Sequence, residues 1–226
     1  MNVLSHKSFR ILFFILVIAE LVCSSISDLS SLHYVTKPAI VIALLLFFVK
    51  HSQTQTRFIK RNTILALVFS WLGDVLLMFV ETSPHFFTLG LVAFLLAHVM
   101  YIRVFLKHRN PRKSPIAFIL IMVLYAVGMF YFLREGLGSM LVPVLVYMTV
   151  ILSMSTSAYL RKGMVNSASY NWVLMGAFLF MLSDSILALN KFYQPLPYSN
   201  ISIMLTYALA QYSIVLGILK LKNTNV

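Results

Sequence analysis

The chain has 226 residues, of which 60% are hydrophobic and 11% charged, and its mean hydropathy is +0.90. A soluble domain has about 25% charged residues, so the composition excludes that class and indicates an integral membrane protein. The only cysteine is Cys23, which excludes an internal disulfide and a metal-binding cysteine cluster.

Eight apolar segments follow in chain order, most of them near the ~20 residues that a helix needs to cross a bilayer. We therefore predict an all-α integral membrane protein with eight transmembrane helices, in a single domain over residues 1–226. Glu20 interrupts the first segment and no small-residue cleavage pattern follows, so we expect a retained helix rather than a signal peptide. Pro38 is expected to open the second helix, where its missing N–H does no harm. The segments are 9–27, 34–49, 62–80, 86–106, 115–133, 140–160, 170–190 and 199–219.

The basic residues predict an orientation for these helices. If the N-terminus is inside, 15 of the 18 Lys and Arg residues fall in or beside inner segments, and only Lys37, Arg134 and Lys191 fall outside. Inner loops of membrane proteins carry this excess of positive charge, so we predict that both termini are cytoplasmic. The rule also explains the net charge of +12 without a nucleic acid partner. Contact with anionic membrane lipids is a second role open to residues 57–61 and 107–113.

Two aspartates lie inside apolar segments in similar contexts, Leu-Gly-Asp-Val-Leu around Asp74 and Leu-Ser-Asp-Ser-Ile around Asp184. An acid within the bilayer is expensive, so it usually faces the protein interior and has a function there. The alternative is a structural hydrogen bond that fixes helix packing. Both helices run outward, and both carboxylates are expected about 10 Å below the outer helix ends. Equal direction and depth suggest a parallel four-plus-four repeat with halves 1–113 and 114–226.

Two further helices carry polar pairs. His98 and Tyr101 are three residues apart, and Tyr207 and Gln211 are four apart, so the members of each pair share a helix face. His98 is the one histidine that lies well inside a predicted helix. The sequence leaves two roles open for these side chains, a functional site or hydrogen bonds between helices.

Two charged side chains near the outer side complete the candidates. Glu20 lies inside the first helix, where Ser24 one turn later could satisfy it locally. Lys37 is predicted just outside the second helix. It could anchor that helix at the interface, with its stem along apolar surface, or contact a phosphate group.

The stretch Phe-Ser-Trp-Leu-Gly-Asp-Val-Leu-Leu-Met at residues 69–78 resembles the signature of the YhhN-like family, which includes the mammalian transmembrane lysoplasmalogenases. The similarity extends from about residue 34 to 216, and the Gly-Asp-Val-Leu-Leu-Met and Ser-Asp elements are its most specific parts. The other matching positions are Lys37, Pro38, Phe86, Phe87, Gly90, Phe94, Ala97, His98, Tyr101, Gly176, Ala177, Phe180, Ser183, Asp184, Ala188, Ala210 and Gln211.

The resemblance implies an eight-helix membrane hydrolase that cleaves the vinyl ether bond of lysoplasmalogens. The products would be a fatty aldehyde and glycerophosphoethanolamine or glycerophosphocholine. The two family aspartates correspond to Asp74 and Asp184. Neither a metal nor an organic cofactor is required, and the expected partner is a lysophospholipid substrate. The sequence does not define an oligomeric state.

Vinyl ether hydrolysis begins with protonation of the β-carbon, after which water adds to an oxocarbenium ion and the hemiacetal collapses. One of Asp74 and Asp184 would be the general acid. The other would stabilise the cation and activate water, as paired carboxyl groups do in glycosidases. Lys37 would meet the phosphate headgroup. His98, Tyr101, Tyr207, Gln211 and Glu20 would orient the substrate, the carboxyl groups or the water.

Two other classes compete with this hypothesis. Paired intramembrane acids and an internal repeat also suit a proton-coupled transporter, although no helix is plainly interrupted beside either aspartate. A structural or lipid-sensing membrane protein is the third interpretation. We expect the bacterial inner membrane as the location, with the endoplasmic reticulum as the alternative.

Overall fold

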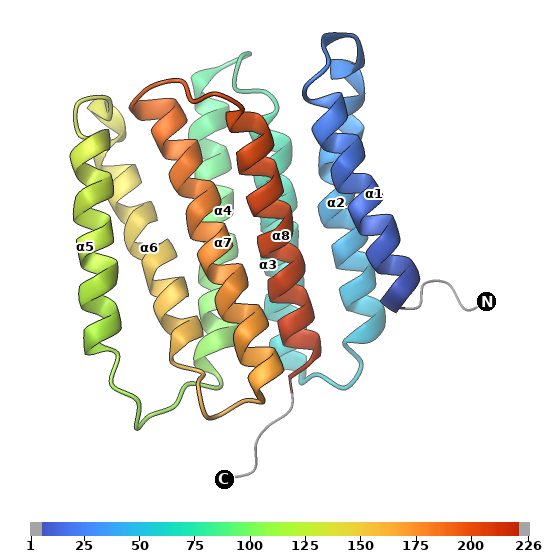
Figure 1. The fold of residues 1–226 in the computed structure, drawn as a ribbon, viewed down its shortest axis with the longest axis vertical. Coiled ribbons are helices and arrows are strands. Elements are labelled where there is room, and N and C mark those ends of the chain that lie inside the picture. Colours follow the sequence, from blue (N-terminus) through green and yellow to red (C-terminus); the bar gives the residue numbers. More distant parts are fainter. Residues whose placement is uncertain (1–5, 222–226) are drawn as a thin grey trace. The chain divides into compact units, whose positions relative to one another are not determined.

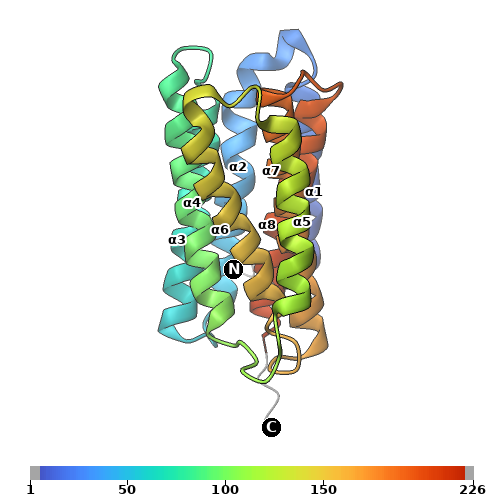
Figure 2. The same cartoon turned by 90° about the vertical axis from the view of Figure 1, so that its left-hand side faces the viewer.

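A computed structural model describes residues 6–221, and in that part of the chain eight α-helices make up almost all the regular structure. The predicted all-α class is confirmed. Two short 3-10 helices, η1 (Ser27–Leu29) and η2 (Gly138–Met140), precede α2 and α6 (Figures 1 and 2). The α-helices are α1 (His6–Cys23), α2 (Ser30–His51), α3 (Arg57–Leu77), α4 (Pro84–Leu106), α5 (Ile116–Leu133), α6 (Leu141–Tyr159), α7 (Ser167–Phe192) and α8 (Ser199–Leu219).

The helices form two compact units, and the boundary between them falls inside α4, between Ala97 and His98. The first unit contains α1, α2, α3 and the first part of α4. The second contains the rest of α4 and α5 to α8. The predicted half-repeats, 1–113 and 114–226, stay a prediction.

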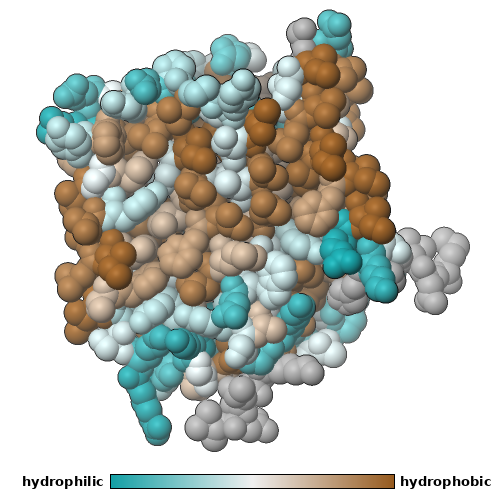
Figure 3. Space-filling view, viewed as in Figure 1, coloured by the Kyte–Doolittle hydropathy of each residue, from teal (hydrophilic) through white to brown (hydrophobic). Residues whose placement is uncertain are grey.

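Apolar side chains on the outer surfaces of the helices indicate a membrane environment. On α5, Ile116, Leu120 and Leu124 are each more than 60% exposed, and Figure 3 shows apolar residues along the helices with hydrophilic residues gathered towards the ends. A soluble protein does not expose an apolar surface of this extent. The chain is therefore a multi-pass membrane protein.

Six helices of the described part are long and apolar enough to span a bilayer. They are α2, α4, α5, α6, α7 and α8. The remaining two carry more charge: α1 contains Lys7, Arg10 and Glu20, and α3 contains Lys60 and Arg61 near its start and Asp74 near its end.

The second helix begins earlier than the sequence predicts. It starts at Ser30, so Pro38 lies inside α2 rather than at its first position, and Lys37 lies within the helix rather than just outside it. Proline removes one backbone hydrogen bond, a loss that helices in membrane proteins tolerate because neighbouring groups satisfy the freed carbonyl. The longer helix also brings His33 into α2.

The sequence predicts that both aspartates lie equally far from the outer ends of their helices, and this prediction is wrong. Asp74 is in the last turn of α3, which ends at Leu77, whereas Asp184 lies two turns before the end of α7 at Phe192. The prediction failed because α3 ends in a turn at residues 78–82, part of which the apolar pattern assigns to the helix.

Small residues allow α7 and α8 to pack side by side (Figure 1). A Cβ atom at Gly176 would lie 2.8 Å from the carbonyl oxygen of Ala210 and 2.7 Å from Ile214 Cγ1. Ser183 of α7 donates a hydrogen bond to the carbonyl of Ile203 at 3.0 Å. Small residues and short polar side chains at a helix interface are typical of membrane proteins.

We predict that Gly176→Ala lowers the free energy of unfolding by about 1–3 kcal/mol, because the added methyl group overlaps the backbone of α8. The matched control is Gly128→Ala on α5, where a Cβ atom meets nothing within 4 Å. Thermal unfolding of both variants in detergent provides the comparison. Equal stability of the two variants would contradict the close approach of α7 and α8.

Candidate functional site

Asp184 is held in the second unit by a tyrosine from another helix. Tyr147 of α6 donates its phenol hydrogen bond to Asp184 Oδ2 at 2.6 Å. The Asp184 side chain is 13% exposed and Tyr147 is buried. A carboxylate away from water is stable only when it is hydrogen-bonded or paired, so this bond fixes both the position of Asp184 and the contact between α6 and α7.

His98 lies against the same carboxyl group. Its Nε2 atom is 3.7 Å from Asp184 Oδ2, and the side chain is fully buried. The imidazole ring packs edge-on against Tyr147 and Phe180, with ring centroids 5.4 and 4.5 Å apart. Neither ring nitrogen has a hydrogen-bond partner within the part of the chain that the structure describes. His98 is thus a buried donor and acceptor beside a carboxyl group.

The predicted pair on α8, Tyr207 and Gln211, is hydrogen-bonded to the predicted pair on α4, His98 and Tyr101, through Tyr101. Tyr101 of α4 donates a hydrogen bond to Gln211 Oε1 of α8 at 2.6 Å, and Gln211 Nε2 lies 3.5 Å from Tyr207 Oη. The Phe180 ring packs edge-on against Tyr207 as well as against His98. Two polar groups of the second unit, His98 with Asp184 and Tyr101 with Gln211 and Tyr207, are therefore linked through the Phe180 ring, and we call these five predicted residues the polar cluster.

Asp74 belongs to the first unit, where it lies in a tightly packed part of α3. The residue is 2% exposed. Its neighbour Gly73 packs against Phe94 of α4, whose ring would lie 2.6 Å from a Cβ atom at this position. The expectation that Asp74 is an interior residue is confirmed. Gly73 precedes it in the motif because a larger side chain there would overlap the Phe94 ring.

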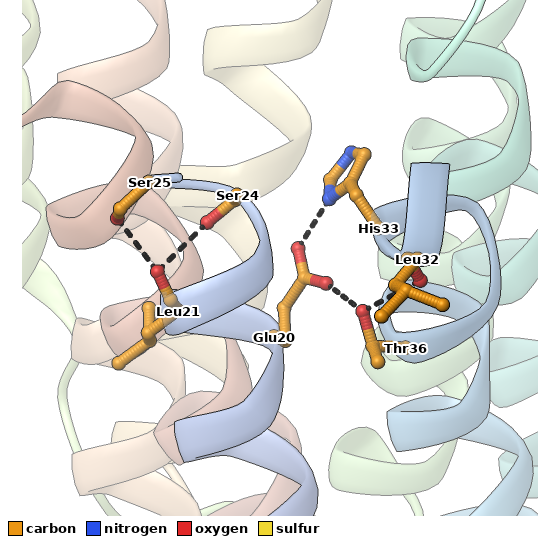
Figure 4. Close-up of polar contacts among 7 residues, drawn as sticks. All are labelled: Glu20, Leu21, Ser24, Ser25, Leu32, His33 and Thr36. Atoms are coloured by element: carbon orange, nitrogen blue, oxygen red, sulfur yellow. Dashed lines mark hydrogen bonds and ion pairs between the residues drawn. The ribbon is translucent and has the colours of Figure 1, made fainter. Parts of the chain in front are cut away.

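Glu20 connects α1 to α2 within the first unit (Figure 4). Its carboxyl oxygens lie 2.7 Å from His33 Nδ1 and 2.5 Å from Thr36 Oγ1, which donates to it. The predicted local partner is wrong, since Ser24 donates to the carbonyl of Leu21 instead. Glu20 itself is 1% exposed, and both partners come from the part of α2 that precedes Pro38, the residue that the sequence predicts to open this helix. Lys37, which follows Thr36 in α2, is half-buried.

Sequence reasoning missed Tyr147, although its helix carries a usable signal. Val144, Tyr147, Ile151 and Met154 recur at helical spacing and are all buried. That pattern defines the inward face of α6, and Tyr147 is the only residue of the four with a hydrogen-bonding side chain. Its partner lies 37 residues away in the sequence, so no local motif identifies the pair.

These features define a class of protein: a multi-pass helical membrane protein with carboxyl groups and a polar cluster inside its helices. Such intramembrane acids mark functional sites by default. The chain belongs to the YhhN family, which matches residues 32–218. The match includes Asp74 and Asp184 and begins after α1, so Glu20 lies outside it.

Curated relatives in mammals and mycobacteria are similar to most of this chain. Human lysoplasmalogenase TMEM86B is 34% identical over 157 residues, which are 69% of this chain and 62% of that protein. Human lysoplasmalogenase TMEM86A is 32% identical, over 67% of this chain and 62% of that protein. A lysoplasmalogenase of Mycobacterium bovis is 28% identical, over 70% and 60%. The chain thus spans about three fifths of the length of the curated relatives that it matches. No solved structure matches it.

We predict that Tyr101→Phe lowers the free energy of unfolding by about 1–3 kcal/mol, because it removes a donor from a buried hydrogen bond. In a Gln211→Leu background the same change is expected to have much less effect, which a double-mutant cycle measures. Tyr131→Phe on the exposed side of α5 is the control and should change stability by less than about 0.5 kcal/mol. Additive effects of Tyr101→Phe and Gln211→Leu would show that the two side chains do not interact.

Proposed function

We propose that this chain is a hydrolase that cleaves the vinyl ether bond of 1-alkenyl lysophospholipids. The reaction adds one water and yields a fatty aldehyde and glycerophosphoethanolamine or glycerophosphocholine. Membership of the YhhN family and the relatives named lysoplasmalogenases support this activity. The single observation that carries the proposal is the carboxyl group of Asp184, which is 13% exposed, is held by the Tyr147 phenol and lies within the residues that the family matches.

The proposed mechanism divides acid and base roles between Asp74 and Asp184. A proton moves from one carboxyl group to the β-carbon of the alkenyl chain, and an oxocarbenium ion forms at the carbon bonded to oxygen. Water adds to this carbon and gives up a proton to the other carboxylate. The hemiacetal then collapses to the aldehyde as its hydroxyl proton passes to the departing glycerol oxygen, and proton exchange with water returns both carboxyl groups to their starting states. Since Asp184 accepts a hydrogen bond from Tyr147, we assign Asp184 to the carboxylate role and Asp74 to the acid role.

The remaining polar residues receive supporting roles in this proposal. His98, Tyr101, Tyr207 and Gln211 orient Asp184 or the water, because they form one cluster with it. Lys37 meets the phosphate of the headgroup. Substrate orientation by Glu20 stays a prediction, and its two contacts to α2 also support a role in holding α1.

The proposed topology has eight membrane spans and both termini in the cytoplasm. The excess of Lys and Arg at one set of helix ends supports it. We place the protein in a bacterial inner membrane, with the endoplasmic reticulum as the alternative. Turnover by purified protein in detergent separates an enzyme from a proton-coupled transporter, since only the enzyme acts without two compartments.

We predict that Asp74→Asn and Asp184→Asn each lower kcat for aldehyde release by about 10²–10⁴-fold, the usual contribution of a positioned acid or base. Asp28→Asn, which changes an exposed acid of η1, is the control and should keep full activity. All three variants should elute like the wild type on size exclusion. Full activity in both well-folded variants at positions 74 and 184 would refute the mechanism.

Tyr147 is proposed as a positioning residue, with a kinetic signature of its own. We predict that Tyr147→Phe lowers kcat about tenfold, with KM nearly unchanged, since a hydrogen bond to a charged group contributes on the order of 1.4 kcal/mol. Tyr125→Phe is the matched control, because it also removes a tyrosine hydrogen bond to α7, here to Ser185 beside Asp184. It should leave kcat unchanged. If the two variants behave alike, the Tyr147 bond serves packing only.

A further inference from the structure

A buried arginine lies at the end of the second unit where α4, α6 and α8 finish (Figure 1). Arg161 follows α6 and is 2% exposed. Its Nη2 donates to Ser169 Oγ of α7 at 2.8 Å, and the Ser169 hydroxyl donates in turn to the carbonyl of Gly217 in α8 at 2.7 Å. The guanidinium carbon lies 5.7 Å from the centroid of the Phe105 ring of α4. Four helices therefore hold this side chain in place.

The charge of Arg161 has no carboxylate partner in the described part of its unit. The acids of residues 98–221 are Glu135 and Asp184, which lie beyond the end of α5 and in the outer half of α7. Arg161 Nε has no hydrogen-bond partner within residues 6–221. Burial lowers the pKa of Arg161 to about 10, because a buried cation loses its hydration. Buried charges are normally paired, so an anion from outside the chain would complete this site.

The surroundings of Arg161 are strongly basic. His108 is half-buried, and its pKa is lowered by burial and by the nearby charges of Arg161 and Lys107. The loop that carries His108 is tied to the loop that carries Arg161, since Asn110 Nδ2 donates to the carbonyl of Lys162 at 3.0 Å. The two joined loops carry the positive charges of Lys107, Arg161 and Lys162, of which Arg161 is the buried one.

Two cation–aromatic pairs place this basic region at the level of a membrane interface. Lys113 Nζ lies 4.0 Å from the centroid of the Tyr159 ring, and Lys220 Nζ lies 5.4 Å from that of Trp172. Tyr and Trp collect at the headgroup level of bilayers. An orientation signal alone needs exposed Lys and Arg and gives no reason to bury Arg161.

We propose that Arg161, together with His108 and Lys162, binds the phosphate of an anionic phospholipid. A phosphodiester oxygen supplies the negative acceptor that the guanidinium lacks, and a planar guanidinium suits phosphate geometry. The lipid tails would lie along the apolar surface of the same unit. This inference does not depend on the proposed hydrolase activity.

The test measures thermal stabilisation of the detergent-purified full chain as a function of added lipid. Phosphatidylglycerol is expected to stabilise the wild type, whereas phosphatidylcholine and inorganic phosphate are not. Arg161→Gln should weaken the apparent affinity for phosphatidylglycerol about tenfold. The control Arg134→Gln, which changes an exposed arginine beyond the end of α5, should leave the affinity unchanged.

Three results would overturn the proposal. Stabilisation by inorganic phosphate as strong as by phosphatidylglycerol would identify a soluble anion instead of a lipid. No stabilisation of the wild type would remove the site. Equal losses of affinity in Arg161→Gln and Arg134→Gln would show nonspecific attraction.

If Arg161→Gln does not fold, Ser169→Ala provides a second test, because it keeps the arginine and removes the hydroxyl group that holds it. Ser169→Ala should weaken lipid binding several-fold relative to Ser153→Ala, which changes an exposed serine on α6.

Discussion

The need to stabilise carboxyl groups away from water governs how these helices are held together. An unpartnered carboxylate in an apolar interior is so unfavourable that it must find donors. Asp184 obtains one from Tyr147 of α6, and Glu20 obtains two contacts from His33 and Thr36 of α2. Each bond fixes one helix against another at a defined position. In an apolar protein of this kind, such bonds give specificity that dispersion contacts between aliphatic side chains do not provide.

Close helix packing then supports the polar cluster of the second unit. Gly176 lets α7 approach α8, which carries Tyr207 and Gln211, and the Phe180 ring lies between His98 and Tyr207. The cluster stands on helices rather than loops, so its geometry is set by rigid elements. The proposed chemistry needs this rigidity, because a proton must reach one carbon of a flexible chain.

The sequence predicts the number of helices well, since a backbone in lipid must satisfy its own hydrogen bonds and long apolar runs therefore become helices. It also identifies the inward residues His98, Tyr101 and Gln211 from their spacing. It fails where the result depends on contacts between helices. Pro38 suggested a helix start, but tertiary packing continues α2 back to Ser30, and this hid His33 as the partner of Glu20. Tyr147 resembles ten other tyrosines of the chain until its contact with Asp184 is known.

The central claim is that a carboxylic acid of this protein delivers a proton to carbon. The most direct measurement is mass spectrometry of the aldehyde formed from 1-alkenyl lysophosphatidylethanolamine by the purified protein in D₂O, with the 1-alkyl analogue as the control. Our account predicts an aldehyde that carries one deuterium at the carbon next to the carbonyl, and no product from the alkyl analogue. An aldehyde without deuterium, or no aldehyde from a stable and homogeneous sample, would contradict it.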